Sequence, residues 1–465
     1  MTRKTSPKLL NLLRFSPLLT LAFAAANESH AAASPRNHLQ TNAGGPALIA
    51  TNGSERATTG AGNKIVTFAD KTHVVWQKSA KRGYFNKIRT LDRATGEWSK
   101  EFSLNEGVDN HARPVITVDR EGHLHVVLSG HNSTMSYRRS LRPNDGSEWG
   151  PVEAAGVGTY PSIACGRDNR IFMAARAHGQ KGADFYIRTP DGKWSEGLRL
   201  VKRAKEYSGY AGFTTGLTVD RQGTLHFICN VYEGKSGKHQ ALCYMRSPDE
   251  GKTWRTAAGN PVKIPARPED MDLLLDDSTP RLKVVTWPWI NSRGNIVADS
   301  QGSPFVAYVS HVERPGEVIL ASADKDGQWT QRRVTAAENA FSDLRPMGVS
   351  VALSIDSADT LHLLLELTPL DDGWTQGKPL RTTVFREEPV KRLVLLSSRD
   401  RGKTFKVQSI VKPGAMFNMA TMERPTGVNE LPAGRPPPIL YFDGTCRYPK
   451  PGEVINNNVF LVAPK

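Results

Sequence analysis

Beyond its first 26 residues, the 465-residue sequence has no apolar run long enough to form a transmembrane helix. It also has no dense run of basic residues, although Lys and Arg (61) outnumber Asp and Glu (46) and give a net charge of +15. The first absence argues against a membrane span. The second argues against nucleic-acid binding, because the positive charge is dispersed rather than concentrated in a patch that the sequence can identify.

The apolar residues at the N-terminus have the pattern of a secretory signal peptide. Basic residues, among them Lys4, Lys8 and Arg14, precede an apolar run at 15–26, and small alanines at 31–33 suit a cleavage site. We therefore expect residues 1–33 to be a signal peptide and the mature chain, 34–465, to be secreted or periplasmic. An exported basic protein usually meets polyanions such as acidic polysaccharides, although positive charge also serves solubility alone.

A short motif recurs along the mature chain. Its copies are "VDREGHLHVV" (118–127), "VDRQGTLHFI" (219–228), "ADSQGSPFVA" (298–307) and "IDSADTLHLL" (355–364). Each copy places a tight turn between two apolar, β-rich segments, which is the pattern of a β-hairpin. The recurrence predicts a repeat architecture rather than two or three separate domains.

A second motif follows the first one in each repeat. "CYMRSPDEGKTW" (243–254) and "LSSRDRGKTF" (396–405) contain S-x-D-x-G-x-T followed by an aromatic residue, the Asp-box pattern. Degenerate copies end at Trp98, Trp149, Trp194 and Trp329. Two turns and four strands per repeat are typical of a propeller blade. We therefore expect an all-β fold, a single β-propeller over 34–465 with seven four-stranded blades; six or eight blades are the alternatives.

The hairpin within "DNHARPVITVDREGHLHVVLSGHNS" carries a histidine outside each end of its two strands. The turn lies at Gly122, so His111 and His131 should meet at the open end of the hairpin. In an antiparallel blade the two repeat turns share one face. We therefore expect the Asp-box turns on the face opposite the two histidines.

Overlaying the neighbouring repeats adds further side chains to the histidine face. The next repeat places His178 at the position of His131, with Tyr160 before its first strand and Arg176 near the end of its second. Later repeats place Tyr232 and His311 there.

Each of these candidates also has a simpler interpretation. Taken alone, His311 is more typical of a solvated loop residue, and Tyr160 before Pro161 fits a turn. Arg176 differs, because the arginines of the repeat stand elsewhere, at 139, 188 and 246. We expect His111, His131, Tyr160 and Arg176 to be catalytic, and His178, Tyr232 and His311 to bind substrate.

With its two-histidine hairpin, Tyr-Pro pair and following arginine, the chain resembles the seven-bladed ulvan lyases and related BNR-repeat proteins. The resemblance covers most of the mature chain, but only 109–178 is specific. It implies that His111 and His131 correspond to the active-site histidines of that family, Tyr160 to its tyrosine and Arg176 to its arginine. It also implies lyase activity on a uronate-containing, sulfated polysaccharide such as ulvan.

The same residues suit β-elimination on chemical grounds. The C5 proton of a uronate becomes removable when a fixed cation neutralises the adjacent carboxylate, and the guanidinium of Arg176 can grip both carboxylate oxygens. A neutral histidine can take the proton, and the Tyr160 hydroxyl can protonate the leaving oxygen, although the sequence does not divide these roles. This chemistry requires no cofactor.

Two alternatives remain open. A sialidase-like hydrolase would need three arginines around a carboxylate and a Tyr–Glu nucleophile pair, which we cannot assemble from the non-repeat arginines. A non-catalytic carbohydrate-binding propeller would have an aromatic rim without a His–Tyr–Arg set. In each case the partner is a carbohydrate, and we expect a monomer.

Four cysteines remain in a chain expected to be exported. Cys229 and Cys243 stand at equal distances in the sequence from Ser236, the centre of a predicted hairpin turn, so they should face each other on adjacent strands. There they could form a disulfide, bind zinc together with His178, or remain buried thiols. The acidic stretch "EDMDLLLDDS" (269–278) could hold calcium, although a solvated loop is the simpler interpretation. A structural metal therefore stays open.

Overall fold

The structure, a computed structural model, describes residues 45–59, 62–203, 211–233, 239–276, 290–291, 294–310, 316–369, 392–411, 417–450 and 452–463. All of them belong to one compact unit, Gln40–Lys465. The predicted signal peptide and His311 lie outside the described residues.

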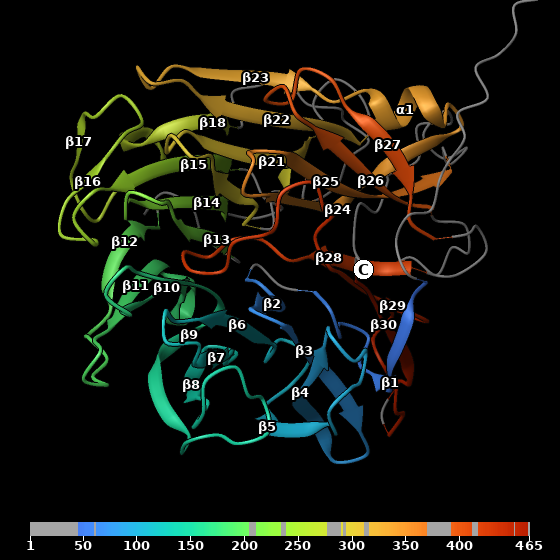
Figure 1. Ribbon diagram of the computed structural model, residues 1–465. Coiled ribbons are helices and arrows are strands. Elements are labelled where there is room, and N and C mark those ends of the chain that lie inside the picture. The colour runs from blue at the N-terminus through green and yellow to red at the C-terminus, as the bar shows by residue number, and fades with distance from the viewer. Residues whose placement is uncertain are drawn as a thin grey trace, which may run out of the picture. The chain divides into compact units, whose positions relative to one another are not determined.

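Antiparallel strands make up nearly all of the described secondary structure (Figure 1). One sheet has the order β28 (Phe417–Met422), β29 (Ile439–Asp443), β30 (Asn457–Val462), β1 (Ala47–Gly53), β3 (Lys71–Ala80), β4 (Gly83–Asp92) and β5 (Phe102–Gly107), with β2 (Ile65–Phe68) paired to β3. A second has the order β12 (Leu198–Lys202), β11 (Gly182–Arg188), β10 (Ile171–Ala177), β9 (Glu153–Cys165), β8 (Ser133–Arg139), β7 (Leu124–Leu128) and β6 (Pro114–Val118).

Three further sheets follow along the chain. The third contains β13 (Gly212–Val219), β14 (Leu225–Glu233), β15 (His239–Ser247), β16 (Trp254–Arg255) and β17 (Pro261–Val262), with β18 (Asp272–Asp276) paired to β15. The fourth contains β19 (Ile290–Asn291), β21 (Pro304–Ser310), β22 (Glu317–Ala323) and β23 (Trp329–Arg333), with β20 (Ile296–Ala298) paired to β21. The fifth contains β24 (Leu344–Ile355), β25 (Leu361–Pro369), β26 (Arg392–Ser398) and β27 (Lys406–Ser409).

The described helices are short: α1 (Ala336–Ala340) and the 3₁₀ turns η1 (His178–Gln180) and η2 (Pro268–Asp270). None of the helices in the described ranges has the length and apolar character that a bilayer crossing requires. The all-β class predicted from the repeats is therefore confirmed.

Apart from the short strands β17, β18 and β19, the described strands can be divided into seven groups of four, which we number along the chain. Group 1 is β2–β5, group 2 is β6–β8 with the first half of β9, group 3 is the second half of β9 with β10–β12, group 4 is β13–β16, group 5 is β20–β23, group 6 is β24–β27, and group 7 is β28–β30 with β1. The strand β9 joins groups 2 and 3, because its first half pairs with β8 and its second half pairs with β10.

The hairpin predicted around Gly122 is present. Strand β6 pairs with β7 from Pro114 opposite Leu128 to Val118 opposite Leu124. In the connecting turn, Asp119 Oδ1 accepts hydrogen bonds from the backbone N–H groups of Glu121 (3.0 Å) and His123 (2.8 Å). Asp220, Asp299 and Asp356 make the corresponding pair of bonds in their own turns. The repeated aspartate therefore stabilises the turn of each hairpin through two hydrogen bonds to the backbone of that turn.

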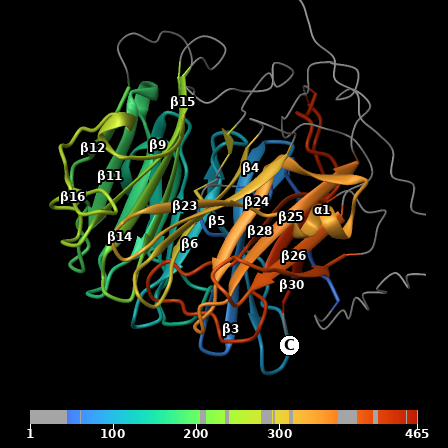
Figure 2. The same cartoon turned by 90° about the horizontal axis from the view of Figure 1, so that it is seen from above.

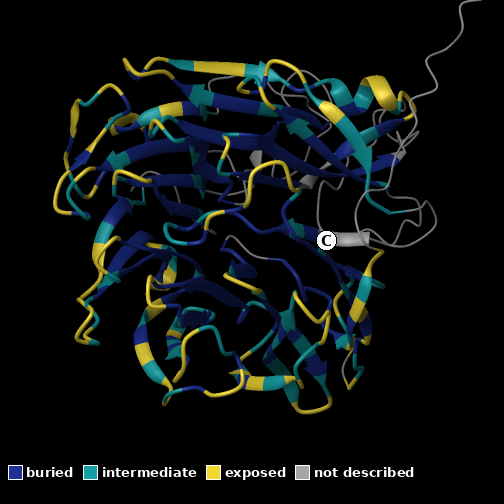
Figure 3. Ribbon diagram, viewed as in Figure 1, coloured by how far each residue is buried: buried dark blue, intermediate teal, exposed yellow. Residues whose placement is uncertain are grey.

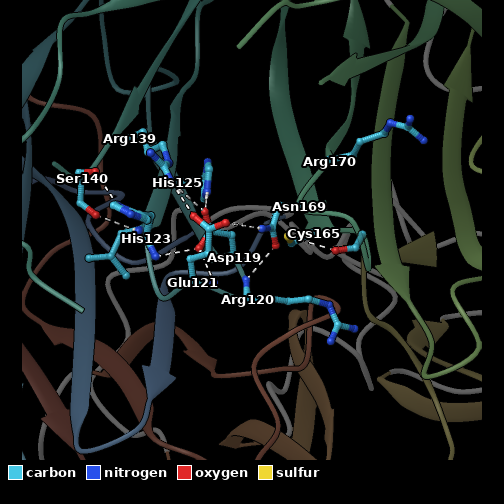
Figure 4. Close-up of polar contacts among 12 residues, drawn as sticks. Asp119, Arg120, Glu121, His123, His125, Arg139, Ser140, Cys165, Asn169 and Arg170 are labelled. Carbon is cyan, nitrogen blue, oxygen red and sulfur yellow. Dashed lines mark hydrogen bonds and ion pairs between the residues drawn. The ribbon is translucent and has the colours of Figure 1, made fainter. Parts of the chain in front are cut away.

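The histidine of the repeated Leu-His pair has a structural role that the sequence analysis did not assign. His125 places Nε2 3.0 Å from Asp119 Oδ2 and Nδ1 2.6 Å from the Tyr137 hydroxyl (Figure 4). His226 makes the same two contacts, with Asp220 and with the Tyr244 hydroxyl. Because both ring nitrogens are used, these buried histidines are part of the scaffold.

The two predicted Asp-box segments form turns with matching hydrogen bonds. Asp249 Oδ1 accepts bonds from the Ser247 hydroxyl (2.9 Å) and from the Thr253 N–H (2.8 Å). Asp400 makes the same bonds with Ser398 and Thr404. The aromatic residue after the first turn, Trp254, is buried and packs edge-on against Phe185.

Apolar side chains pack between successive strand groups, because alternate residues of each strand face opposite sides. Figure 3 shows that much of the strand ribbon is buried. In group 2, for example, Ile116 packs toward group 1 and Val115 toward group 3. The seven apolar clusters among the described residues join groups 1–2, 2–3, 3–4, 4–5, 5–6, 6–7 and 7–1. Groups 7 and 1 meet through residues such as Phe442 and Trp76.

The segment 423–434, which follows β28, contacts the first strands of several groups. Glu423 Oε1 accepts a bond from the Thr67 N–H in group 1, and the Thr426 hydroxyl bonds that of Thr117 in group 2. The Cys165 N–H at the end of β9 donates to the Thr426 carbonyl, and Thr218 of group 4 donates to the Pro425 carbonyl. The segment 423–434 thus links, through hydrogen bonds, strands that lie far apart in the sequence.

The two histidines and the Asp-box turns lie at opposite ends of the strands. The Arg120 N–H donates to Asn169 Oδ1 across neighbouring turns (Figure 4). The adjacent Arg170 pairs with Glu250, which lies in the turn after Asp249. Asp249 is therefore at the Gly122 end of the hairpin, away from His111. Many of the strands run roughly alongside one another (Figure 2).

Candidate active site

His111 and His131 meet at the open end of the β6–β7 hairpin, as predicted. Their rings stack with centroids 3.9 Å apart and an angle of 24° between the planes. The carboxylate of Asp109 holds both rings: Oδ1 lies 3.1 Å from His111 Nδ1, and Oδ2 lies 2.5 Å from His131 Nδ1. Oδ1 also accepts the backbone N–H of His111 at 2.7 Å. One carboxylate therefore fixes the whole pair.

The electrostatics of this cluster favour a neutral His111 beside a charged Asp109. Burial lowers the pKa of His111 to about 4, against the opposing effect of the Asp109 carboxylate. Burial by itself would raise the pKa of Asp109, but the hydrogen bonds from His111 and His131 outweigh it and hold that pKa below its ordinary value. At neutral pH, His111 is an unprotonated imidazole that can accept a proton.

Tyr160 lies in β9 at the join between groups 2 and 3. Its backbone is in the left-handed region, with φ at 60°, where residues other than glycine are uncommon. The Tyr160 N–H donates to the Ser129 hydroxyl at 3.0 Å, which helps to hold this conformation. The Tyr160 ring centroid is 6.0 Å from that of His111. Unfavourable backbone angles at a residue of this type often mark functional sites.

Two guanidinium groups lie over the ring of Tyr160. Arg176, on β10, is only 1% exposed, and its guanidinium carbon is 4.8 Å from the ring centroid. Arg113, just before β6, lies 5.1 Å from the same centroid. Such cation–π contacts contribute on the order of 0.5–2 kcal/mol each, so they help to hold the phenol in place. Two positive charges are thereby placed beside the phenol of Tyr160.

His111, Arg113, Ser129 and Tyr160 line a small recess with an empty volume of about 180 Å³. Lys64 also lines it; this side chain is fully buried, and its ammonium donates to the Pro114 carbonyl. Burial, with the nearby charge of Arg113, lowers the pKa of Lys64 well below its ordinary value.

The structure places the other predicted site residues less centrally. His178 is exposed in η1, and its Nδ1 is 2.8 Å from the carbonyl of Asn132, next to His131. Tyr232 lies near the end of β14 that is remote from the Asp220 turn, opposite Gly212. The prediction for His311 lies outside the described residues. The four predicted catalytic residues thus come together, with His178 beside them.

One group of potential metal ligands stands out in the described ranges. Asp109, His111 and His131 bring three ligand atoms within 4.8 Å of one another, close enough to share one ion. Cys229 and Cys243 are buried free thiols directly opposite each other on β14 and β15. His178 does not join them in a three-ligand group of that size. The described carboxylates of the predicted calcium stretch do not form such a group either.

Sequence reasoning did not identify three residues of the site: Asp109, Arg113 and Lys64. Asp109 stands two residues before His111, and the D-x-H spacing is the signal that could have revealed it. Arg113 and Lys64 carry no such local signal, because their contacts with the recess depend on the assembled strand groups.

Comparisons with known proteins show the family and the fold of the chain. The sequence model of the BNR repeat-containing family matches residues 66–337, more than half of the chain. The chain belongs to the BNR repeat-containing family. It is 18% identical over 319 residues to an ulvan lyase of Alteromonas sp. (strain LOR) and 22% identical over 321 residues to an ulvan lyase of Nonlabens ulvanivorans. The matches cover 60% and 59% of this BNR repeat protein, and 64% and 66% of those relatives, just under two thirds of their length.

Solved structures show the same fold. A polysaccharide lyase of family PL25, an ulvan lyase, superposes with a TM-score of 0.65 at 14% identity and covers 90% of this chain and 96% of its own. The polysaccharide lyase Uly1 superposes with a TM-score of 0.56 at 11% identity, covering 87% of this chain and 90% of its own. The predicted resemblance of this BNR repeat protein to the ulvan lyases is therefore confirmed.

Proposed function

We propose that this protein is a secreted polysaccharide lyase that cleaves an acidic, uronate-containing polysaccharide by β-elimination. One observation carries the proposal: the phenol of Tyr160 lies beside a stacked histidine pair and under the guanidinium groups of Arg113 and Arg176. This arrangement combines a neutral base, a hydroxyl donor and fixed positive charge, which are the three requirements of the reaction.

The reaction assigns each group a task. The buried guanidinium of Arg176 pairs with the uronate carboxylate and lowers the cost of the negative charge that develops when the C5 proton leaves. A neutral histidine of the pair accepts that proton. The C5–H electrons form the C4–C5 double bond, the C4–O bond breaks, and the Tyr160 hydroxyl protonates the leaving oxygen. The buried environment of Arg176 strengthens its attraction to the carboxylate, because little water screens it.

We further propose that the substrate is sulfated. A solved PL25 ulvan lyase with a TM-score of 0.65 to this chain is bound to -[GlcA(1-4)Rha3S]-, a disaccharide unit with a uronate and a sulfated sugar. Arg113 supplies cationic charge at the recess, and Arg176 lies over the same Tyr160 ring. The net charge of +15 would concentrate a polyanion around the whole chain. Export through the predicted signal peptide would bring the protein to such a polymer.

The proposed scaffold is a closed, seven-bladed propeller with the Asp-box turns on the face opposite the site. The seven strand groups, the apolar cluster between groups 7 and 1, and the segment 423–434 that fastens several groups support a closed ring. Such a ring removes exposed sheet edges and gives β9 and β10 a rigid base.

The test is to incubate the purified protein with a panel of uronate polysaccharides, sulfated and desulfated, and to follow the ultraviolet absorbance of an unsaturated uronate. We expect absorbance to rise with the sulfated uronate polymer. Chain cleavage without that absorbance would support the sialidase-like hydrolase instead. Binding without cleavage would support a carbohydrate-binding propeller.

A further inference from the structure

We propose that Asp109 is the positioning residue of this site: its carboxylate sets the tautomer of both histidines and leaves each Nε2 nitrogen as a proton acceptor. The inference rests on the proposed function and goes beyond it, because it identifies the atoms that take the proton and the residue that prepares them.

The two carboxylate oxygens of Asp109 determine which ring nitrogens carry protons. A carboxylate only accepts hydrogen bonds. Its two oxygens face different rings, Oδ1 facing His111 Nδ1 and Oδ2 facing His131 Nδ1. Each Nδ1 must therefore carry a proton and donate it. A neutral imidazole has one N–H, so a neutral ring that donates from Nδ1 has an unprotonated Nε2.

The scaffold histidines of the same repeats provide a contrast. His125 and His226 each engage both ring nitrogens, with an aspartate on Nε2 and a tyrosine hydroxyl on Nδ1. In His111 and His131 the ring hydrogen bonds among the described residues are those between Nδ1 and Asp109. An aspartate thus contacts Nε2 of the scaffold ring at one end of the hairpin, whereas at the other end it contacts Nδ1 and leaves Nε2 as an acceptor.

The negative charge of Asp109 also stabilises the histidine cation that forms after proton transfer. When one histidine accepts the C5 proton at Nε2, the ring becomes a cation that still donates Nδ1–H to the carboxylate. The ion pair stabilises that cation beside its stacked neighbour. Asp109 need not touch the substrate to act in this way.

The decisive variant is Asp109→Asn, which keeps the size of the side chain. An asparagine offers one acceptor and one donor where the carboxylate offers two acceptors. It can therefore support only one ring as the Nδ1–H tautomer and favours Nδ1 of the other ring as an acceptor. We expect kcat to fall on the order of 10²-fold or more, as misaligned catalytic groups do, with a much smaller change in KM.

The tautomers can be read directly by nitrogen-15 NMR of the histidine rings, with His111 and His131 assigned by single substitutions. In the wild-type protein both rings should be protonated at Nδ1, and in Asp109→Asn one should change to Nε2. Formate should restore part of the activity of Asp109→Ala, because Asp109 is partly exposed, with 37% of its side chain accessible. These readouts separate a positioning role from a merely structural one.

Asp119→Asn is the matched control. It alters an Asp–His contact in the same hairpin at the opposite end. It should lower thermal stability while the rings of His111 and His131 keep their tautomers and kcat stays within a few-fold.

Two results would overturn the proposal. The first is an Asp109→Asn variant in which both rings stay protonated at Nδ1 or kcat is unchanged. The second is a loss of activity on dialysis against a chelator that zinc reverses, since the three side chains would then be metal ligands. The NMR measurement needs no substrate, so inactivity of the wild-type protein on every polysaccharide would refute the proposed function without deciding the role of Asp109.

Discussion

Arg176 lies opposite Thr159 in the β9–β10 ladder, and its guanidinium carbon is 4.8 Å from the centroid of the Tyr160 ring. The strand register therefore brings the phenol and the buried cation together. This contact links the fold to the chemistry, because any change in the register would move the cation away from the recess.

Removing this cation should abolish turnover. We expect Arg176→Ala to reduce kcat/KM on the order of 10³-fold, comparable with the loss of a key electrostatic donor in other enzymes. Arg176→Lys should restore only part of the activity, since a lysine cannot grip two carboxylate oxygens in one plane. Initial rates on a uronate polysaccharide measure both variants. Arg139→Ala, at the opposite end of the hairpin, is the control and should retain activity; an equal loss there would contradict the assignment.

Removing either proton-transfer group should have a comparable effect. General acid–base groups typically contribute about 10²–10⁴-fold, so we expect His111→Ala and Tyr160→Phe each to lower kcat within that range. Circular dichroism should remain that of the wild-type protein. The sequence predicts for His311 either a substrate-binding role or that of a solvated loop residue, and in both cases His311→Ala should leave kcat little changed. Wild-type rates for Tyr160→Phe would remove the tyrosine from the mechanism.

The buried histidines predict how stability depends on pH. The pKa of His73 falls from 6.5 to about 4 on folding because the ring is buried, and that of His111 does the same. Between these values the unfolded chain binds more protons than the folded one, so the free energy of unfolding should decrease as the pH falls from 6.5 toward 4. Urea unfolding at pH 7 and pH 4.5 measures the effect. His73→Gln should reduce the slope, and an equal midpoint at both pH values would contradict the assignment.

The four cysteines allow a prediction about their oxidation state and about bound zinc. Cys165, Cys229, Cys243 and Cys446 are all buried free thiols in the structure. We expect four thiols to titrate after denaturation and metal analysis to find no zinc at the Cys229–Cys243 pair. Two thiols instead of four would favour a disulfide between these strands.

The sequence was sufficient to predict the local features of the fold. Asp119 and its three counterparts close turns within a few residues, and strand alternation identifies the flanking β6 and β7. Aligning the neighbouring repeats then predicted that His131, Tyr160 and Arg176 lie at the same end of the strands. The repeats were enough for this prediction, because it required no information about contacts between distant residues.

Other residues could not be assigned in that way. Lys64 reaches the recess from group 1, and the segment 423–434 fastens groups from the C-terminal part of the chain. These contacts depend on how the strand groups pack against one another, which the sequence pattern of a single group does not determine. The buried His125 has the same residue type as His111, and only burial and the occupancy of both ring nitrogens distinguish scaffold from site.

Mass spectrometry of the products tests the central claim most directly. If the protein cleaves a uronate polysaccharide by β-elimination, each new chain end will carry an unsaturated uronate, and the oligosaccharides will be lighter by one water than the products of hydrolysis. The cleavage step itself takes no oxygen from labelled water, and label can enter only by slow exchange at reducing ends. Saturated products that contain one labelled oxygen per cleavage would contradict the lyase mechanism.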